Sequence, residues 1–173
     1  MELTKKWLNE QGACDEAVKA FCNQRERDSL KILKLLIKSK EEEKLDWANW
    51  LIVRLMTYRQ YVSYAVFAAE QVIGKYEKKY PDDKRPREAI EAAKKCINNP
   101  SKENKNAAAA YAACTAYAAY AAYAAAYAAC TAYAAAAAAD AAYAAAAYAA
   151  AATKQKIKIR ILNHGIKILE GKE

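Results

Sequence analysis

The sequence has little of what interrupts helices or builds a common active site. Its 173 residues include only four Gly, three Pro, two Phe and one His. Residues 107–152 contain no Gly or Pro, which excludes a collagen-like chain, a Gly/Ser linker and an all-β fold. No segment holds the roughly 20 strongly apolar residues that a membrane-spanning helix needs, so we expect no membrane span.

Catalytic and metal-binding motifs are missing as well. The chain has no P-loop, no G-x-S-x-G and no H-E-x-x-H sequence. Its single histidine, His164, has no Ser or Cys partner at a familiar spacing, so we expect it to pack between helices or lie at the surface rather than act as a base. We therefore predict that the protein is not an enzyme and has no catalytic residue, metal site or cofactor.

The cysteines do not form a metal-binding or disulfide pattern. They are odd in number and include no C-x-x-C, and the first residues lack the apolar stretch of an export signal. We expect a cytoplasmic protein with reduced thiols, most of which are small core residues. The five cysteines are Cys14, Cys22, Cys96, Cys114 and Cys130.

A run of Ala and Tyr dominates the second half of the chain. Of the 46 residues from 107 to 152, 33 are Ala and eight are Tyr. Alanine has the highest helix propensity, so this segment is predicted to be helical. One straight helix would be about 69 Å long at about 1.5 Å per residue, whereas a compact protein of this size has a radius of gyration of roughly 16 Å. We expect at least one break, and Asp140, the only charged residue of the run, is the best candidate N-cap.

Apolar spacing and capping residues predict helices in the rest of the chain. Thr57 and Gln60 form a capping-box pattern that ends one helix and starts the next, and Pro81 stops that second helix. The tail alternates like a strand at 156–161, but its apolar residues also fit a helical stripe, and we predict a helix. The other helices are expected at residues 3–11, 15–23, 30–37, 45–56 and 87–98.

These elements predict an all-α fold, a compact bundle of about eight helices. We expect one domain over residues 1–173, with a helical half at 1–100 and the Ala/Tyr-rich helices and a C-terminal helix at 101–173. Alanine lets helix backbones approach closely, while tyrosine adds contact area and a hydroxyl that needs a partner. We therefore expect the Ala/Tyr-rich helices to pack against the Trp- and Tyr-rich helical pair at 45–80.

The chain is basic, with 28 Lys and Arg against 20 Asp and Glu and a net charge of +8. A basic surface suits an acidic protein, an anionic nucleotide or a nucleic acid, although lysines interspersed with acids also suit an ordinary solvated surface. A binding site would combine aromatic residues for stacking with arginines for anions. The candidate ligand- or partner-binding residues are Trp47, Trp50, Arg54, Arg85, Arg87, Tyr117, Tyr120 and Asp140.

Two of these charged positions raise alternatives. Asp140 lies in an otherwise uncharged run, so we expect a cap or an ion pair, and the arginines among the candidates are its possible partners. Arg87 lies near the start of a predicted helix, where backbone N–H groups favour anions, so phosphate capture is one hypothesis. Pairing with acids nearby in the sequence is the alternative that we favour. Those acids are Asp82, Asp83, Glu88 and Glu91.

Several segments resemble one family. They are GACDEAVKAF at 12–21, DWANWLIVRLM at 46–56, KKYPDDKRPREAIEAAKK at 78–95 and GIKILEG at 165–171. Together with the Ala/Tyr run, they are similar to immunity proteins, which are Ala-rich helical domains of bacteria and their phages. The resemblance covers nearly the whole chain, and residues 81–93 are its most specific part. It implies an all-helical fold and a role in microbial conflict, and it provides no catalytic residues.

Two hypotheses about function follow. In the first, the chain is a non-enzymatic binding protein that neutralises a target, as an immunity protein or a phage counter-defence inhibitor. It would cover the surface of a protein partner, or sequester an anionic, nucleotide-like ligand in a pocket of Tyr, Trp and Arg. In the second, it binds nucleic acid through a continuous Lys and Arg stripe, with affinity that falls steeply with salt. Tyr-rich Ala helices also favour self-association into a homo-oligomer.

Overall fold

The described part of the chain is built from helices. The structure, a computed structural model, describes the backbone of residues 1–114 and 151–172 and the side chains of residues 1–108 and 154–172. Within these ranges the chain forms eight helices and no β-strand, which confirms the predicted all-α bundle. The helices are α1 (Lys5–Glu10), α2 (Asp15–Asn23), α3 (Ser29–Ser39), α4 (Glu42–Arg54), α5 (Tyr58–Lys79), α6 (Arg85–Asn98), α7 (Lys102–Cys114) and α10 (Ala151–Leu169).

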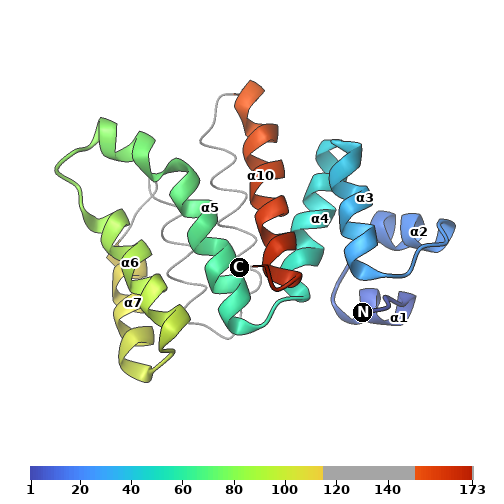
Figure 1. The fold of residues 1–173 in the computed structure, drawn as a ribbon, viewed down its shortest axis with the longest axis horizontal. Coiled ribbons are helices and arrows are strands. Elements are labelled where there is room, and N and C mark those ends of the chain that lie inside the picture. The colour runs from blue at the N-terminus through green and yellow to red at the C-terminus, as the bar shows by residue number, and fades with distance from the viewer. Residues whose placement is uncertain (115–150, 173) are drawn as a thin grey trace.

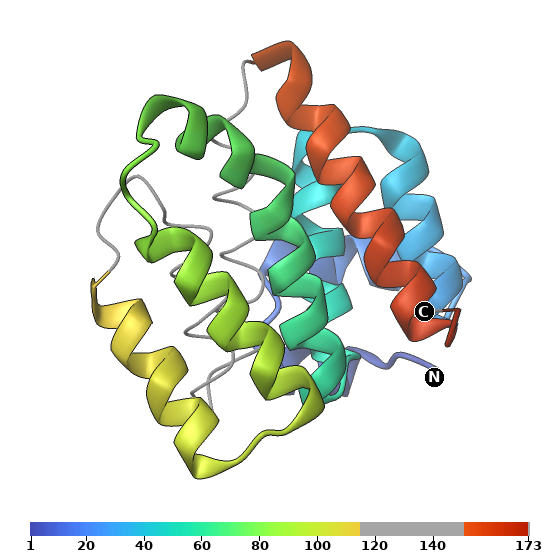
Figure 2. The ribbon, with the colours of Figure 1, turned by 60° about the vertical axis from the view of Figure 1, so that its left-hand side comes forward.

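The last helix, α10, lies between α5 and α4 (Figure 1). α10 packs against α3, α4 and α5, although it follows them by a long stretch of sequence. α6 packs on α5 and α7 packs on α6, so these three form one side of the molecule, as the turned view also shows (Figure 2). α1 and α2 lie at the opposite side, beyond α3 and α4. The two ends of the described chain meet, because Met1 and Leu169 line one small hollow.

The Ala/Tyr run contributes to two of these helices. Residues 107–114 form the end of α7, which packs beside α6, and residues 151 and 152 begin α10. The first half of α7 also reaches α5, where Lys105 Nζ lies 4.9 Å from the centre of the Tyr58 ring. The predicted break at Asp140 and the predicted packing of the rest of the run lie outside the described residues.

Local signals set most of the helix ends. Thr4 caps α1, where its side chain accepts a hydrogen bond from a backbone N–H of the first turn at 3.1 Å. Asp28 caps α3 in the same way at 2.9 Å. The predicted capping box of Thr57 and Gln60 is confirmed at the start of α5. α6 begins two residues earlier than predicted, because Pro86 fits the first turn of a helix.

The core lies where α4, α5 and α10 meet. Its fully buried side chains are mostly aliphatic, and burial of each one contributes about 1.5–3 kcal/mol to folding. Two buried polar groups lie among them, and the Tyr64 hydroxyl donates a hydrogen bond to Asn49 Oδ1 at 2.7 Å. This bond links α4 to α5 and gives each group a partner in the interior. Fully buried aliphatic side chains of this region include Leu45, Ile52, Val62, Ile161 and Leu162.

Gly165 determines how closely α10 approaches that core. A Cβ atom at this position would lie 2.6 Å from Ile52 Cδ1 and 2.8 Å from Tyr64 Cε2. Both distances are far shorter than van der Waals contact, so a larger residue fits only if α10 or its neighbours shift. The hydrogen bond between Tyr64 and Asn49 resists such a shift.

Two further predictions concern the membrane and the cysteines. None of the described helices is both long and apolar enough to cross a membrane. Among the described cysteines, Cys96 is buried, but Cys14 and Cys22 are exposed near the two ends of α2. Cys96 thus fits the prediction that most thiols are core residues, whereas Cys14 and Cys22 do not, because α2 is a short helix at the edge of the bundle and buries only one face. Cys114 and Cys130 lie outside the described side chains.

Replacement of Gly165 by alanine tests the close approach of α10. We expect Gly165→Ala to lower the free energy of unfolding by about 1–3 kcal/mol. The destabilisation by overpacking exceeds the stabilisation from the higher helix propensity of alanine. Gly74→Ala is the matched control, since Gly74 also lies within a helix but a Cβ there would have no neighbouring atom within 4 Å. It should raise stability by up to about 1 kcal/mol. Urea unfolding measures both, and equal effects of the two substitutions would contradict the role of Gly165.

Candidate functional site

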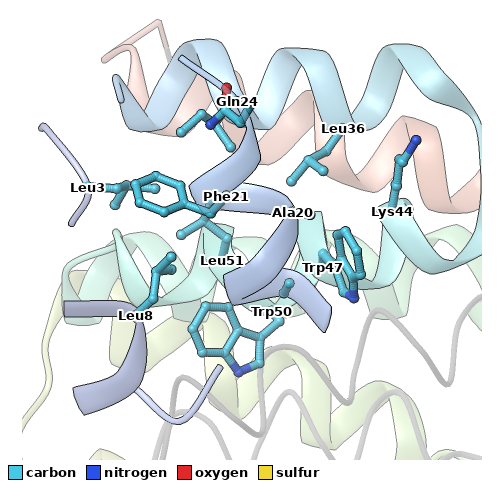
Figure 3. Close-up of a pocket in the computed structure, with 12 residues that line it drawn as sticks. Leu3, Leu8, Ala20, Phe21, Gln24, Leu36, Lys44, Trp47, Trp50 and Leu51 are labelled. Carbon is cyan, nitrogen blue, oxygen red and sulfur yellow. The ribbon is translucent and has the colours of Figure 1, made fainter. Parts of the chain in front are cut away.

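A cavity of about 140 Å³ lies between α2, α3 and α4 (Figure 3). Two predicted site residues of α4, Trp47 and Trp50, line it. α2 contributes Ala17 and Ala20, and these small side chains leave space that larger ones would fill. We call this hollow the tryptophan cavity. Its other described lining residues are Leu3, Leu8, Phe21, Gln24, Ile32, Leu36, Lys44 and Leu51.

Arg27 holds one wall of the tryptophan cavity in place. Its guanidinium group donates hydrogen bonds to the backbone carbonyls of Phe21 at 3.3 Å and Gln24 at 2.6 Å, at the end of α2. The same group lies 4.4 Å from the centre of the Phe21 ring. Arg27 therefore adds side-chain donors to the carbonyls at the end of α2, where the Phe21 carbonyl also accepts the Gln24 N–H at 3.4 Å, and it holds Phe21 against the cavity.

Arg54 lies on the same helix as the two tryptophans. Its guanidinium carbon is 3.9 Å from the centre of the Trp50 ring, and its Nη1 donates a hydrogen bond to the Trp50 carbonyl at 2.8 Å. The cation–π contact explains how a charged residue is accommodated on a largely apolar helix. Arg54 also lines a separate hollow beside α1, together with Trp7. The structure thus brings Arg54 next to Trp50, although not into the tryptophan cavity.

Arg85 and Arg87 lie on α6, far from the tryptophans, because α5 and α10 intervene (Figure 1). Arg85 binds Asp83 at 2.7 and 2.8 Å, and Arg87 binds Glu77 of α5 through two hydrogen bonds of 2.8 Å. Arg85, together with the hydroxyl of Tyr76, holds the pKa of Asp83 well below its usual range. The favoured acid pairing is confirmed for Arg85. Its details were wrong for Arg87, since packing of α5 on α6 supplies Glu77 instead of an acid close in sequence.

Three of the predicted site residues lie outside the part of the chain that the structure describes. Tyr117, Tyr120 and Asp140 lie outside the described residues, and with them the predicted ion pair of Asp140. Among the others, the structure groups the two tryptophans with Arg54 and separates them from the arginines of α6.

A second hollow, of about 500 Å³, lies at the surface between α5 and α10. Phe67 of α5 stacks on His164 of α10, with ring centres 3.6 Å apart and ring planes 11° apart. This stacking confirms that His164 packs between helices. The edge along α10 carries exposed polar residues spaced three or four positions apart, which places them on one face of the helix. We call this hollow the basic groove, and those residues are Lys156, Arg160, Asn163 and Lys167.

The cations of the basic groove face solvent. Lys156 and Lys167 make no ion pair with any residue that the structure describes, and Arg160 donates a hydrogen bond to Gln71 Oε1 at 3.3 Å. Their helical spacing is visible in the sequence, but they were not among the predicted site residues. The apolar stripe of this segment predicts a helix. The sequence does not show that the exposed residues beside the stripe line a hollow, because Phe67 of α5 forms the opposite wall.

The other face of α10 carries a buried cation that binds α4. Lys158 is 7% exposed, and its ammonium group lies 3.0 Å from Glu42 Oε1 and also binds Asp46. Burial by itself lowers the pKa of Lys158, but the hydrogen bonds to Asp46 and Glu42, together with the negative charge of these two acids, raise it overall. Lys158 and Lys154 in turn lower the pKa of Glu42. These ion pairs orient α10, and so they place the basic groove on its outer side.

Comparison with known proteins identifies the family. Residues 52–164, more than half of the chain, match the family described as Imm-5 like putative immunity protein. The chain belongs to this family. The match confirms the family that the sequence resembles, although the segments at 12–21 and 165–171 lie outside it, and membership suggests a non-enzymatic immunity role with a protein partner. No curated protein and no solved structure matched the chain.

The region matched to the immunity-protein family contains most of the basic groove but not the tryptophan cavity. It includes α5, α6, α7 and α10 as far as His164, and therefore most of the basic groove. It begins at Ile52, directly after Leu51, the last of the residues that line the tryptophan cavity. The cavity is thus built from residues that precede the matched region.

The ion pairs of Lys158 can be tested by removing either sign of charge. We expect Glu42→Gln combined with Asp46→Asn to lower the free energy of unfolding by about 2–4 kcal/mol, because a buried ammonium group then lacks compensating charge. Lys158→Met is the matched variant. It should cost less than about 1 kcal/mol, since it keeps the apolar stem and leaves two acids that water can solvate. Urea unfolding measures both, and a larger loss for Lys158→Met would contradict this account.

Proposed function

We propose that this chain is a non-enzymatic immunity protein that neutralises a protein partner by covering part of its surface. Membership of the immunity-protein family is the observation that carries the proposal. We propose the basic groove as the contact face, because it combines a stacked aromatic pair with exposed cations. Such a protein needs affinity and a complementary shape rather than a catalytic residue. It acts in the cytoplasm, where its thiols stay reduced.

An acidic patch on the partner would complement the basic groove. Lys156, Arg160 and Lys167 follow one face of α10 over about three helical turns. Attraction between oppositely charged patches accelerates association and selects the partner. Phe67, held by its stacking on His164, supplies a rigid aromatic side chain near these charges, and aromatic side chains contribute strongly to binding at protein interfaces.

An anionic, nucleotide-like ligand is the second candidate for the same groove. Its volume of about 500 Å³ lies within the range of roughly 300–1,000 Å³ that is usual for small-molecule sites. Lys and Arg bind phosphate groups, and aromatic rings stack with bases. The tryptophan cavity does not suit such a ligand, because it measures about 140 Å³ and its described lining is mostly apolar.

Direct nucleic-acid binding is the alternative that rests on net charge. The three cations of the basic groove would neutralise few phosphates, so they favour weak binding with a shallow dependence on salt. A mobility-shift experiment at low salt tests this alternative. Absence of a complex would exclude it, and a sequence-independent complex whose affinity falls steeply between about 50 and 200 mM salt would favour it over a protein partner.

Charge reversal in the basic groove tests the proposed contact face. We expect the triple variant Lys156→Glu, Arg160→Glu and Lys167→Glu to lose at least tenfold in affinity, because three attractive contacts become repulsive. The measurement is rescue of growth during co-expression with the toxic product of a neighbouring gene, followed by titration calorimetry of the pair. The same gene neighbourhood separates an immunity protein beside its toxin from a phage counter-defence inhibitor.

A second triple variant provides the control for net charge. Lys5→Glu, Lys19→Glu and Lys95→Glu change the total charge equally at exposed positions on α1, α2 and α6. This control should keep rescue and affinity within about twofold. Equal loss in both triple variants would contradict the basic groove as the contact face. A rise in melting temperature with nucleotides, lost only in the groove variant, would favour the nucleotide-like ligand instead.

A further inference from the structure

The tryptophan cavity has the size and lining of a site for a small apolar molecule. We propose that it binds one uncharged apolar ring of about the size of benzene or toluene. A cavity of about 150 Å³ lined by Leu, Ile and Phe stays dry and accepts benzene, and this cavity measures about 140 Å³. The proposal is independent of the basic groove, because the two hollows share no lining residue.

The lining favours an uncharged ligand. Only two of the described lining residues, Gln24 and Lys44, are polar apart from the indole groups. The Lys44 ammonium group is already 2.7 Å from Glu41 Oε1. The Gln24 amide donates to the Glu26 carbonyl at 2.6 Å and accepts from the Glu26 N–H at 2.9 Å. A charged ligand would lose its water and would have to compete with Glu41 for Lys44, whereas an apolar ring carries no charge to desolvate.

Three aromatic side chains form part of the cavity wall. Trp47 and Trp50 provide large aromatic surfaces from α4, and Phe21 adds a third ring from α2 (Figure 3). Aromatic rings prefer stacked or edge-to-face contacts with one another, which favours an aromatic ligand among apolar ones. Phe21 is held by Arg27 through both its carbonyl and its ring, so this wall is in place before a ligand binds.

A route into the cavity exists along α2. Ala20 at the cavity edge is exposed, and both Trp47 and Trp50 are half-buried rather than sealed inside. Space is left on the α2 side because Ala17, which is half-buried, and Ala20, which is exposed, are both small. A ligand would therefore fill the space beside these two alanines and make the contacts that larger side chains would make.

The experiment uses the full chain with benzene and, as a matched probe, benzoate. At about ten times its dissociation constant, benzene should raise the melting temperature by about 3–5 °C. It should also shift the tryptophan emission, because two of the three tryptophans line the cavity. Benzoate has the same ring with a charge and should produce neither effect. Absence of both effects with benzene would overturn the proposal.

Two variants locate the bound molecule. Ala17→Leu fills the cavity and should abolish the benzene effects, while Lys19→Leu adds the same side chain at an exposed position of α2 and should keep them. Leu36→Ala enlarges the cavity and should extend binding to naphthalene, which the original chain should reject. If Ala17→Leu does not fold, Leu36→Ala decides alone. Benzene effects that persist in a folded Ala17→Leu variant, or no gain of naphthalene binding by Leu36→Ala, would overturn the proposed location.

Discussion

The close approach of α10 to α4 and α5 is the constraint on which the rest of the structure depends. Gly165 has no side chain, and this lets the helix backbone approach Ile52 and Tyr64 to distances that a Cβ atom would not permit. Tyr64 is itself held by its buried hydrogen bond to Asn49. Because α10 also contacts α3, its position determines how the two sides of the bundle are joined.

Charge on the two faces of α10 follows from that packing. The inner face carries Lys158, which is buried yet paired with Glu42 and Asp46 across a sequence separation of more than 100 residues. On the outer face, neither Lys156 nor Lys167 makes an ion pair with any residue that the structure describes. One helix therefore holds the bundle together with one face and presents the basic groove with the other.

The two hollows divide between the matched and unmatched parts of the chain. The immunity-protein region starts at Ile52 and contains α5 and α10 as far as His164, and so most of the basic groove. The tryptophan cavity is lined by residues that precede Ile52, and α4 supplies its tryptophan-bearing wall. The proposed partner-binding face and the proposed small-molecule site can coexist. α5 and α10 form the basic groove, whereas α2 and α3 complete the tryptophan cavity on the other side of α4 (Figure 1).

The sequence by itself determined the helices, since their signals act within a few residues. Capping by Asp28, the Thr57 and Gln60 capping box and the stop at Pro81 needed no partner from elsewhere in the chain. Tertiary structure decided which faces of those helices are buried and which charges meet. Arg87 binds Glu77 because α5 packs on α6, and Cys22 is exposed because α2 lies at the edge. Tertiary structure also decided the basic groove and the tryptophan cavity. Each combines side chains from separate helices, and no local sequence pattern encodes the distances between those helices.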